Sequence, residues 1–282
     1  QTNRFFAYYL ALVLTTGGLG YSPWVLASYG LFSYDMVFVL VFMILGSASP
    51  TIAALIVSRL QFGKMGPDYI FRQFYIRGAP KPWLLVAAIL PLALASSAAL
   101  LWILAGGEYN YSLSPLKLLE FFPILLSNFV VNVWEEVGWR GYALPTLQRK
   151  YSALSSSLII GIVWAVWHWP HFAVKDSAMA VNYHNFLYFL AFMPLFSVSY
   201  TLIYNSSKGN LFAPSLYHAS TNAANIVLFA EPGVSNQVFP FYFLVVAALA
   251  IVIILAFKPD SLSRKGRATL DRVMDTKVKN KI

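Results

Sequence analysis

Three short runs of the sequence hold nearly all of the ionisable side chains that interrupt its apolar stretches. They are residues 133–141, 164–171 and 215–222, and they supply two adjacent glutamates, an arginine and three histidines. An ionisable group inside a membrane segment is costly, so each of these residues is a candidate for function. A carboxylate facing a histidine in a partly dehydrated pocket can activate water. An imidazole beside an amide can stabilise an oxyanion.

Spacing within the first and third runs predicts separate tasks for their side chains. Glu136 and Arg140 are four residues apart and are predicted to form an ion pair on one helical face. Glu135 points about 100° away around the same helix, which leaves it free to act on a substrate. His218 and Asn222 are also four residues apart, so both can address one reacting group.

Helical geometry predicts that the three runs meet at one level. Glu135 and His168 are equally far along the chain from a turn expected near Tyr151 and Ser152. In an antiparallel helical hairpin with a rise of ~1.5 Å per residue, both side chains lie ~25 Å from that turn. This requires the helix that holds Glu135 to continue through residues 140–148. His218, near the start of a later helix, can reach the same layer.

Three motifs occur in this order: a double glutamate followed by arginine, a tryptophan before a histidine, and a histidine before an asparagine (Glu135, Glu136 and Arg140; Trp164 and His168; His218 and Asn222). They resemble the motifs of the CPBP family, which comprises CAAX proteases and bacteriocin-processing or immunity proteins and is also called the Abi family. The type II CAAX prenyl endopeptidase belongs to this family. The resemblance covers roughly residues 110–230.

The resemblance implies an intramembrane endopeptidase that hydrolyses a peptide bond near the cytoplasmic membrane surface without a cofactor or metal ion. Its substrate would be a CAAX-type or other membrane-associated peptide, with or without a lipid. The family pattern implies a water-activating pair followed by an oxyanion-binding pair: Glu135 and His168, then His218 and Asn222. Glu136 and Arg140 would support the site or orient the substrate. Trp164 stands where Phe is commoner in the family, which we interpret as a conservative difference.

Each motif also has a purely structural interpretation. The glutamate–arginine cluster could simply dock helices, although one arginine cannot neutralise two carboxylates. His168 could pack among tryptophans, and the pair His218 and Asn222 could join helices by hydrogen bonds. His171 is interpreted as an interfacial histidine without a catalytic role.

Two other functions compete with the metal-independent peptidase. Histidines and a glutamate are competent zinc ligands, so a zinc-dependent membrane peptidase is one alternative, although the sequence has no His-Glu-x-x-His motif. The other is a non-catalytic membrane protein, such as a bacteriocin-immunity factor or a scaffold. Polar residues collected in one layer fit a site better than the path of a transporter.

Composition indicates the environment of these motifs. Hydrophobic residues make up 59% of the 282 and charged residues only 11%, whereas soluble domains carry about 25% charged residues. The chain is therefore predicted to expose most of its surface to lipid. Its net charge of +9 comes from residues between apolar runs and at the C-terminus, which argues against nucleic acid as a partner. Without cysteine, disulfides and thiol nucleophiles are excluded.

Eight apolar segments predict an all-α, polytopic membrane protein, since each can cross a hydrocarbon layer of about 30 Å. Their spans are 5–27, 36–58, 83–105, 116–139, 153–173, 185–205, 210–229 and 238–257. If both ends are cytoplasmic, all but two of the 20 Lys and Arg residues fall on the cytoplasmic side. This asymmetry predicts an N-in, C-in orientation.

The organisation that follows is one membrane-embedded domain, residues 1–257, and a basic cytoplasmic tail, residues 258–282. Residues 64–83 mix aromatic and basic side chains and are predicted to form an amphipathic segment in the membrane interface. We expect a prokaryotic plasma membrane, an active site open to the cytoplasmic side, and contacts with lipid and a peptide substrate.

Overall fold

A computed structural model describes residues 2–31, 33, 35–75, 80–108, 115–174, 177–183, 185–229 and 234–275 of the 282. Every secondary-structure element in these ranges is helical. The long helices are α1 (Thr2–Ser28), α2 (Met36–Phe62), α4 (Lys81–Leu104), α5 (Pro115–Gly138), α7 (Ala153–Trp167), α10 (Phe186–Ser206), α11 (Phe212–Phe229) and α12 (Val234–Phe257). Each of the eight predicted segments corresponds to one of these helices. The predicted all-α membrane fold is confirmed.

Six of the described helical stretches are long and apolar enough to cross a membrane, and they include α1, α2, α4, α10 and α12. The sixth is Ala153–Ala173, which contains α7. The remaining two predicted crossings, α5 and α11, carry most of the polar motif residues, which lower their hydropathy. The count of eight crossings and the N-in orientation stay predictions.

Two local departures from regular helix lie beside the motif residues. After α5 the chain continues through one turn of π-helix, Trp139–Ala143, into α6 (Leu144–Leu147). The helical path that starts in α5 therefore continues toward the turn near Tyr151. This continuation is what the prediction that Glu135 and His168 lie at one level requires. The predicted segment 153–173 is broken at His168, between α7 and α8 (Trp169–Ala173). Pro170 explains this break, because it lacks the N–H that would continue the helix.

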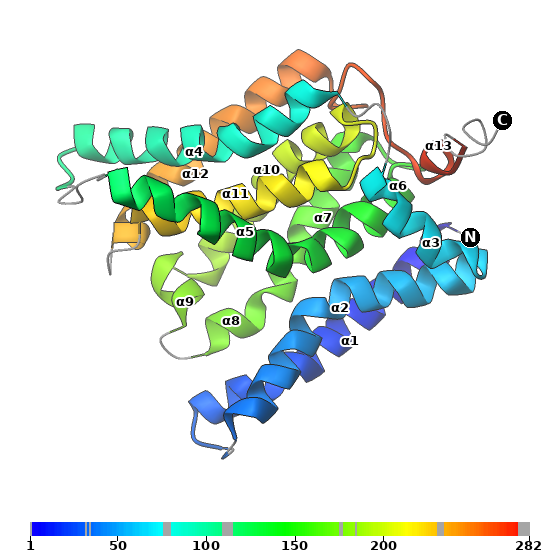
Figure 1. Cartoon of the computed structure of the whole chain (residues 1–282), viewed down its shortest axis with the longest axis horizontal. Coiled ribbons are helices and arrows are strands. Elements are labelled where there is room, and N and C mark those ends of the chain that lie inside the picture. The colour runs from blue at the N-terminus through cyan, green and yellow to red at the C-terminus, as the bar shows by residue number, and fades with distance from the viewer. Residues whose placement is uncertain are drawn as a thin grey trace.

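The arrangement places α5, α7, α10 and α11 together, with the α1–α2 hairpin on one side and α4 with α12 on the other (Figure 1). Small residues allow close approach of helices in this bundle. A Cβ added at Gly138 of α5 would lie 2.4 Å from the carbonyl carbon of Pro50 in α2. One added at Gly161 of α7 would lie 2.4 Å from Cα of Pro194 in α10. These contacts fix α5 and α7, which carry two of the three motifs.

The predicted interfacial segment contains the short helix α3 (Met65–Arg72) and a 3-10 turn, Gln73–Tyr75. Ile70 and Gln73 of this segment are fully buried, whereas Tyr75 is exposed. At the same end of the molecule lie α6 and α13 (Leu270–Asp275) (Figure 1). Residues 65–75 therefore pack partly into the bundle rather than lying wholly on its surface.

The chain after α12 also packs against the bundle as far as the structure describes it, to residue 275. Leu262 and Leu270 are fully buried. The Asn205 amide donates to the Ser261 carbonyl at 2.8 Å, and the Ala268 N–H donates to Asn205 Oδ1 at 3.0 Å. A backbone hydrogen bond of 2.9 Å from Ala153 to the Asp260 carbonyl joins the same segment to the start of α7. Residues 258–275 thus form part of the folded structure.

Candidate active site

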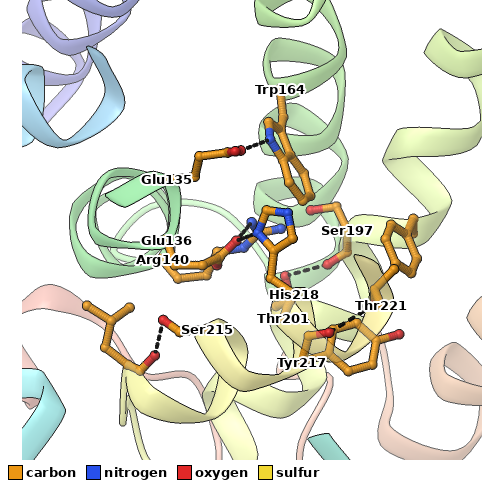
Figure 2. Close-up of polar contacts among 12 residues, drawn as sticks. Glu135, Glu136, Arg140, Trp164, Ser197, Thr201, Ser215, Tyr217, His218 and Thr221 are labelled. Carbon is orange, nitrogen blue, oxygen red and sulfur yellow. Dashed lines mark hydrogen bonds and ion pairs between the residues drawn. The ribbon is translucent and has the colours of Figure 1, made fainter. Parts of the chain in front are cut away.

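Glu135 sits near the end of α5 and is 9% exposed. Its Oε2 accepts a hydrogen bond of 2.9 Å from the indole N–H of Trp164, which comes from α7 (Figure 2). This bond orients the carboxylate without neutralising it. The predicted interpretation of Trp164 as a conservative replacement for Phe is therefore wrong, because Phe has no N–H to donate.

Glu136, one residue further, faces a different set of partners. Its Oε1 accepts from Arg140 Nη1 at 2.9 Å and lies 3.0 Å from His218 Nδ1. The predicted ion pair between Glu136 and Arg140 is thus confirmed, and both side chains are fully buried. Figure 2 shows this cluster beside the bond between Glu135 and Trp164. The spacing of residues alone did not indicate that His218 would contact Glu136.

Aromatic rings supply much of the remaining environment of Arg140. Its guanidinium carbon lies 4.4 Å from the ring centre of Trp164 and 4.0 Å from that of Tyr200. Arg140 Nε and Nη2 have no hydrogen-bond partner among the described residues. Cation–π contact offsets part of the cost of burying such a charge. Tyr200 did not stand out in the sequence, because an aromatic residue in an apolar helix is ordinary.

His168 occupies the break between α7 and α8 and is partly buried. Its Nδ1 lies 2.8 Å from the carbonyl oxygen of Trp164, which can only accept a hydrogen bond. Nδ1 therefore carries the proton, and in the neutral ring Nε2 is left as an acceptor. An acceptor nitrogen of this kind is what a water-activating histidine needs.

The four predicted catalytic residues line one pocket of about 200 Å³, which we call the inner pocket: Glu135, His168, His218 and Asn222. Trp164 and Tyr200 also line it. Within the described part of the chain, no hydrogen bond joins Glu135 directly to His168 or to His218. The geometry brings the four residues around a common space, in which a water molecule or a peptide carbonyl can lie between them.

A second, larger pocket of about 440 Å³, the outer pocket, adjoins the inner one. It lies among α5, α9 (Ala178–Asn182), α11 and the start of α12. Its lining combines apolar side chains with the amides of Asn128, Asn182, Asn222 and Asn225. This pocket could not be predicted from the sequence, because its asparagines are scattered over three helices.

His171 does not line either pocket. Its ring lies 4.7 Å from that of Tyr21 and 5.2 Å from that of Trp24, both in α1. These contacts give it a packing role against the first helix.

A metal centre would need several ligands drawn together at one point. In the ranges that the structure describes, no three His, Asp or Glu side chains form such a group. A zinc-dependent peptidase would have to complete its ligand set with other groups, and a chelator tests that alternative directly.

Comparison with known proteins agrees with the motifs. Residues 117–224, which contain all three motifs, match the family model described as type II CAAX prenyl endopeptidase Rce1-like. A CAAX prenyl protease 2 of Methanococcus maripaludis is 28% identical over 198 residues, which are 64% of this chain and 71% of that protein.

A more distant match is a lysostaphin resistance protein A of Staphylococcus haemolyticus, which is 22% identical over 109 residues. These are 38% of this chain and 28% of that protein. The comparisons support a peptide hydrolase embedded in the membrane. Together the two matches support the CPBP family indicated by the motifs, with an Rce1-like match over residues 117–224.

Proposed function

We propose that this protein is an intramembrane endopeptidase in which Glu135 activates a water molecule to hydrolyse a peptide bond. The observation that carries the proposal is the inner pocket, where Glu135, His168, His218 and Asn222 converge from three separate segments. Its walls are largely aromatic and apolar, so charged groups inside it interact more strongly than they would in water.

Glu135 and the attacking water carry the first step of the proposed reaction. The carboxylate takes a proton from the water as its oxygen bonds to the peptide carbonyl carbon. The same proton then passes to the leaving nitrogen as the carbon–nitrogen bond breaks. His168 supports the water through Nε2, and the indole N–H of Trp164 holds the Glu135 carboxylate in place.

His218 and Asn222 are assigned to the tetrahedral oxygen. Because the Glu136 carboxylate accepts from His218 Nδ1, the ring must be an imidazolium to donate a second hydrogen bond from Nε2. Glu136 and Arg140 therefore position His218 rather than touch the substrate. The side-chain amide of Asn222, one helical turn further along α11, supplies another donor.

A peptide with an apolar or lipidated end is the proposed substrate class. The Methanococcus maripaludis relative is named a CAAX prenyl protease, so a farnesylated CAAX peptide is the first probe. Cleavage of a quenched form of this peptide would be followed with purified protein in detergent. Wild type, Glu135→Ala and wild type with a zinc chelator are compared.

Cleavage that is lost in Glu135→Ala and kept with the chelator is the expected result. Loss under both conditions would favour the zinc-dependent alternative. Full turnover by the Glu135→Ala variant would contradict the role of Glu135.

A non-catalytic resistance factor is the second candidate, because one of the relatives is named a lysostaphin resistance protein. It requires binding but no bond cleavage. Under this alternative, a strain producing Glu135→Ala would keep any resistance that the wild-type protein confers. Under the peptidase proposal the resistance would disappear with the cleavage activity.

A further inference from the structure

Gln73 lies in the 3-10 turn that follows α3 and is fully buried. Its side-chain amide donates a hydrogen bond of 2.7 Å to the Gly141 carbonyl, and its Oε1 accepts one of 2.7 Å from the Tyr204 hydroxyl. Its main-chain carbonyl accepts a third bond, of 3.1 Å, from the N–H of Leu211. These bonds join one residue to three other segments: the π-helical turn, α10 and the start of α11.

The bond to Gly141 supplies a donor at a point where the helical path contains a proline. In a regular helix the Gly141 carbonyl would accept from the residue four positions further on, which is Pro145 and has no N–H. Gly141 belongs to the π-helical turn that continues α5, and Glu135 lies six residues before it. The amide of Gln73 therefore holds the end of the element that carries the proposed general base.

The bond to Leu211 holds the element that carries the proposed oxyanion pair. Leu211 directly precedes α11, and its own carbonyl accepts from the Ser215 hydroxyl at 2.9 Å. His218 follows Leu211 by seven residues, which is two helical turns, so both lie on the same face. The helix of Glu135 and the helix of His218 are thus bonded to one common residue, Gln73.

Close packing around Gly141 reinforces these bonds. A Cβ added to this glycine would lie 3.1 Å from Ile70 Cγ2 of α3 and 3.2 Å from Leu211 Cδ2. Tyr204 adds α10 to the same cluster and lies one turn after Tyr200, which lines the inner pocket. Contacts this close leave little room for the segments to slide past one another. A change in this cluster is therefore transmitted to the helices that carry the motifs.

We propose that Gln73 is a positioning residue of the active site, which sets the placement of Glu135 relative to His218 and Asn222. This rests on the proposed function. Gln73 lines neither pocket, so it acts through the helices and does not touch the substrate. It also lies outside residues 117–224, which match the family model. Because a displacement of about 1 Å can lower a rate by about 10²-fold, these bonds bear directly on kcat.

Gln73→Met tests the proposal, because methionine keeps the length of the side chain but has no N–H to donate. Gln148→Met is the matched control. Gln148 is also fully buried, and its amide donates to Asn205 Oδ1 and to the Ala268 carbonyl. These bonds lead to α10 and to the segment after α12. Both variants remove a buried amide, so both should lower the midpoint temperature of unfolding in detergent.

Cleavage of the farnesylated CAAX probe is measured in detergent at a temperature at which every variant is folded. We expect kcat of Gln73→Met to fall by about 10- to 10²-fold with KM unchanged, and kcat of Gln148→Met to equal that of wild type. Tyr204→Phe keeps the bond from Gln73 to Gly141 and should give a smaller fall. Wild-type kcat in Gln73→Met, or equal falls in the two glutamine variants, would overturn the proposal.

A second readout needs no turnover. Hydrogen–deuterium exchange of the full-length variants in detergent, followed by mass spectrometry, reports how well the main-chain N–H groups of each segment are protected. Gln73→Met should speed exchange in residues 139–143 and 211–218 and leave residues 258–275 unchanged. Gln148→Met should do the reverse.

The exchange pattern separates a failure of this proposal from a failure of the proposed function. Faster exchange confined to residues 65–75 in Gln73→Met would overturn the proposal, because the motif helices would then be held without Gln73. If wild type cleaves no peptide while exchange follows the expected pattern, the proposed function fails and the placement of the two helices by Gln73 stands.

Discussion

The two ends of the helix bundle use their polar residues in opposite ways. At the end that holds α6 and α13, amide groups bond to one another: Gln148 and Asn205 exchange two hydrogen bonds, of 3.0 and 2.7 Å, and Asn205 also binds the segment after α12. At the other end, asparagines of α5, α9 and α11 line a cavity. The same chemical groups therefore close one end and leave the other available to a ligand.

Glu135 and Glu136 stand at the boundary between these two regions. Glu136 belongs to the closed side, because its Oε1 is held by both Arg140 and His218. Glu135 lines the inner pocket and has the Trp164 indole as its hydrogen-bond donor. The two adjacent glutamates thus have different neighbours, and this difference is the basis for proposing a reactive role for Glu135 and a structural role for Glu136.

The largest effect is expected from Glu135→Gln. The amide keeps the size of the side chain and can still accept from Trp164, but it cannot take a proton from water. Since a general base contributes about 10²- to 10⁴-fold in rate, kcat for a cleaved peptide should fall by at least about 10²-fold. The midpoint temperature of unfolding in detergent should not change.

Glu120→Gln is the matched control, because Glu120 lies on the same helix and is exposed. It should leave both kcat and the unfolding temperature at wild-type values. An equal loss of rate in both variants would show that the loss does not depend on the position of Glu135 in the inner pocket.

The long helices and the different positions of Glu135 and Glu136 could be predicted from the sequence, because they depend on local spacing and hydropathy. Apolar length predicted the long helices, and a four-residue interval predicted the ion pair between Glu136 and Arg140. The equal distances of Glu135 and His168 from one turn placed them in a common layer, and both line the inner pocket. Such inferences succeed because helical rise and repeat are nearly invariant.

The second prediction concerns the buried ion pair between Glu136 and Arg140. Arg140→Leu should lower the free energy of unfolding by about 3–5 kcal/mol, because it leaves the buried Glu136 carboxylate without its arginine. The loss would be measured by chemical or thermal unfolding in detergent.

Arg149→Leu is the control. Arg149 pairs with Asp271, but the side chain of Arg149 is 31% exposed and that of Asp271 is 61% exposed. Such a pair contributes about 0–1 kcal/mol, so comparable losses in the two variants would contradict the buried pair's structural role.

Trp164→Phe should have a smaller effect, confined to the reaction. It keeps an aromatic ring beside Arg140 and removes the N–H that orients Glu135. A hydrogen bond to a charged group contributes about 1.5–3 kcal/mol, which corresponds to a fall in kcat of roughly 10- to 10²-fold. Steady-state kinetics should show this fall in kcat with little change in KM.

Trp167→Phe is the natural control, since the indole of Trp167 donates to Ser49 Oγ at 2.9 Å and does not line the pocket. Its kcat should equal that of wild type. If Trp164→Phe also turned over at the wild-type rate, the indole would not position the carboxylate.

Contacts between distant segments could not be predicted from the sequence. The Trp164 donor depends on how α5 and α7 are rotated, and rotation is set by packing such as that of Gly138 against Pro50. The contact of His218 with Glu136 depends likewise on the placement of α11. After α12, the polar composition of residues 258–275 indicates solvent exposure, yet a few buried leucines and main-chain hydrogen bonds attach this segment to the bundle.

The smallest predicted effect concerns the attachment of residues 258–275 to the bundle. Asn205→Ala removes the amide that joins Gln148, Ser261 and Ala268, and it leaves buried polar groups without partners. The expected loss is about 1–3 kcal/mol. Because these bonds hold the segment after α12, the loss should be local, and limited digestion with trypsin should cut faster after Arg264 and Lys265.

Asn128→Ala serves as the control for this digestion, since the Asn128 amide donates to Ile124 of its own helix and lies in the outer pocket. Its C-terminal segment should be cut at the wild-type rate. Faster cutting in both variants would mean that the two ends of the bundle are mechanically coupled. Faster cutting in Asn205→Ala alone would show that the contacts of residues 258–275 are stabilised independently of the outer pocket.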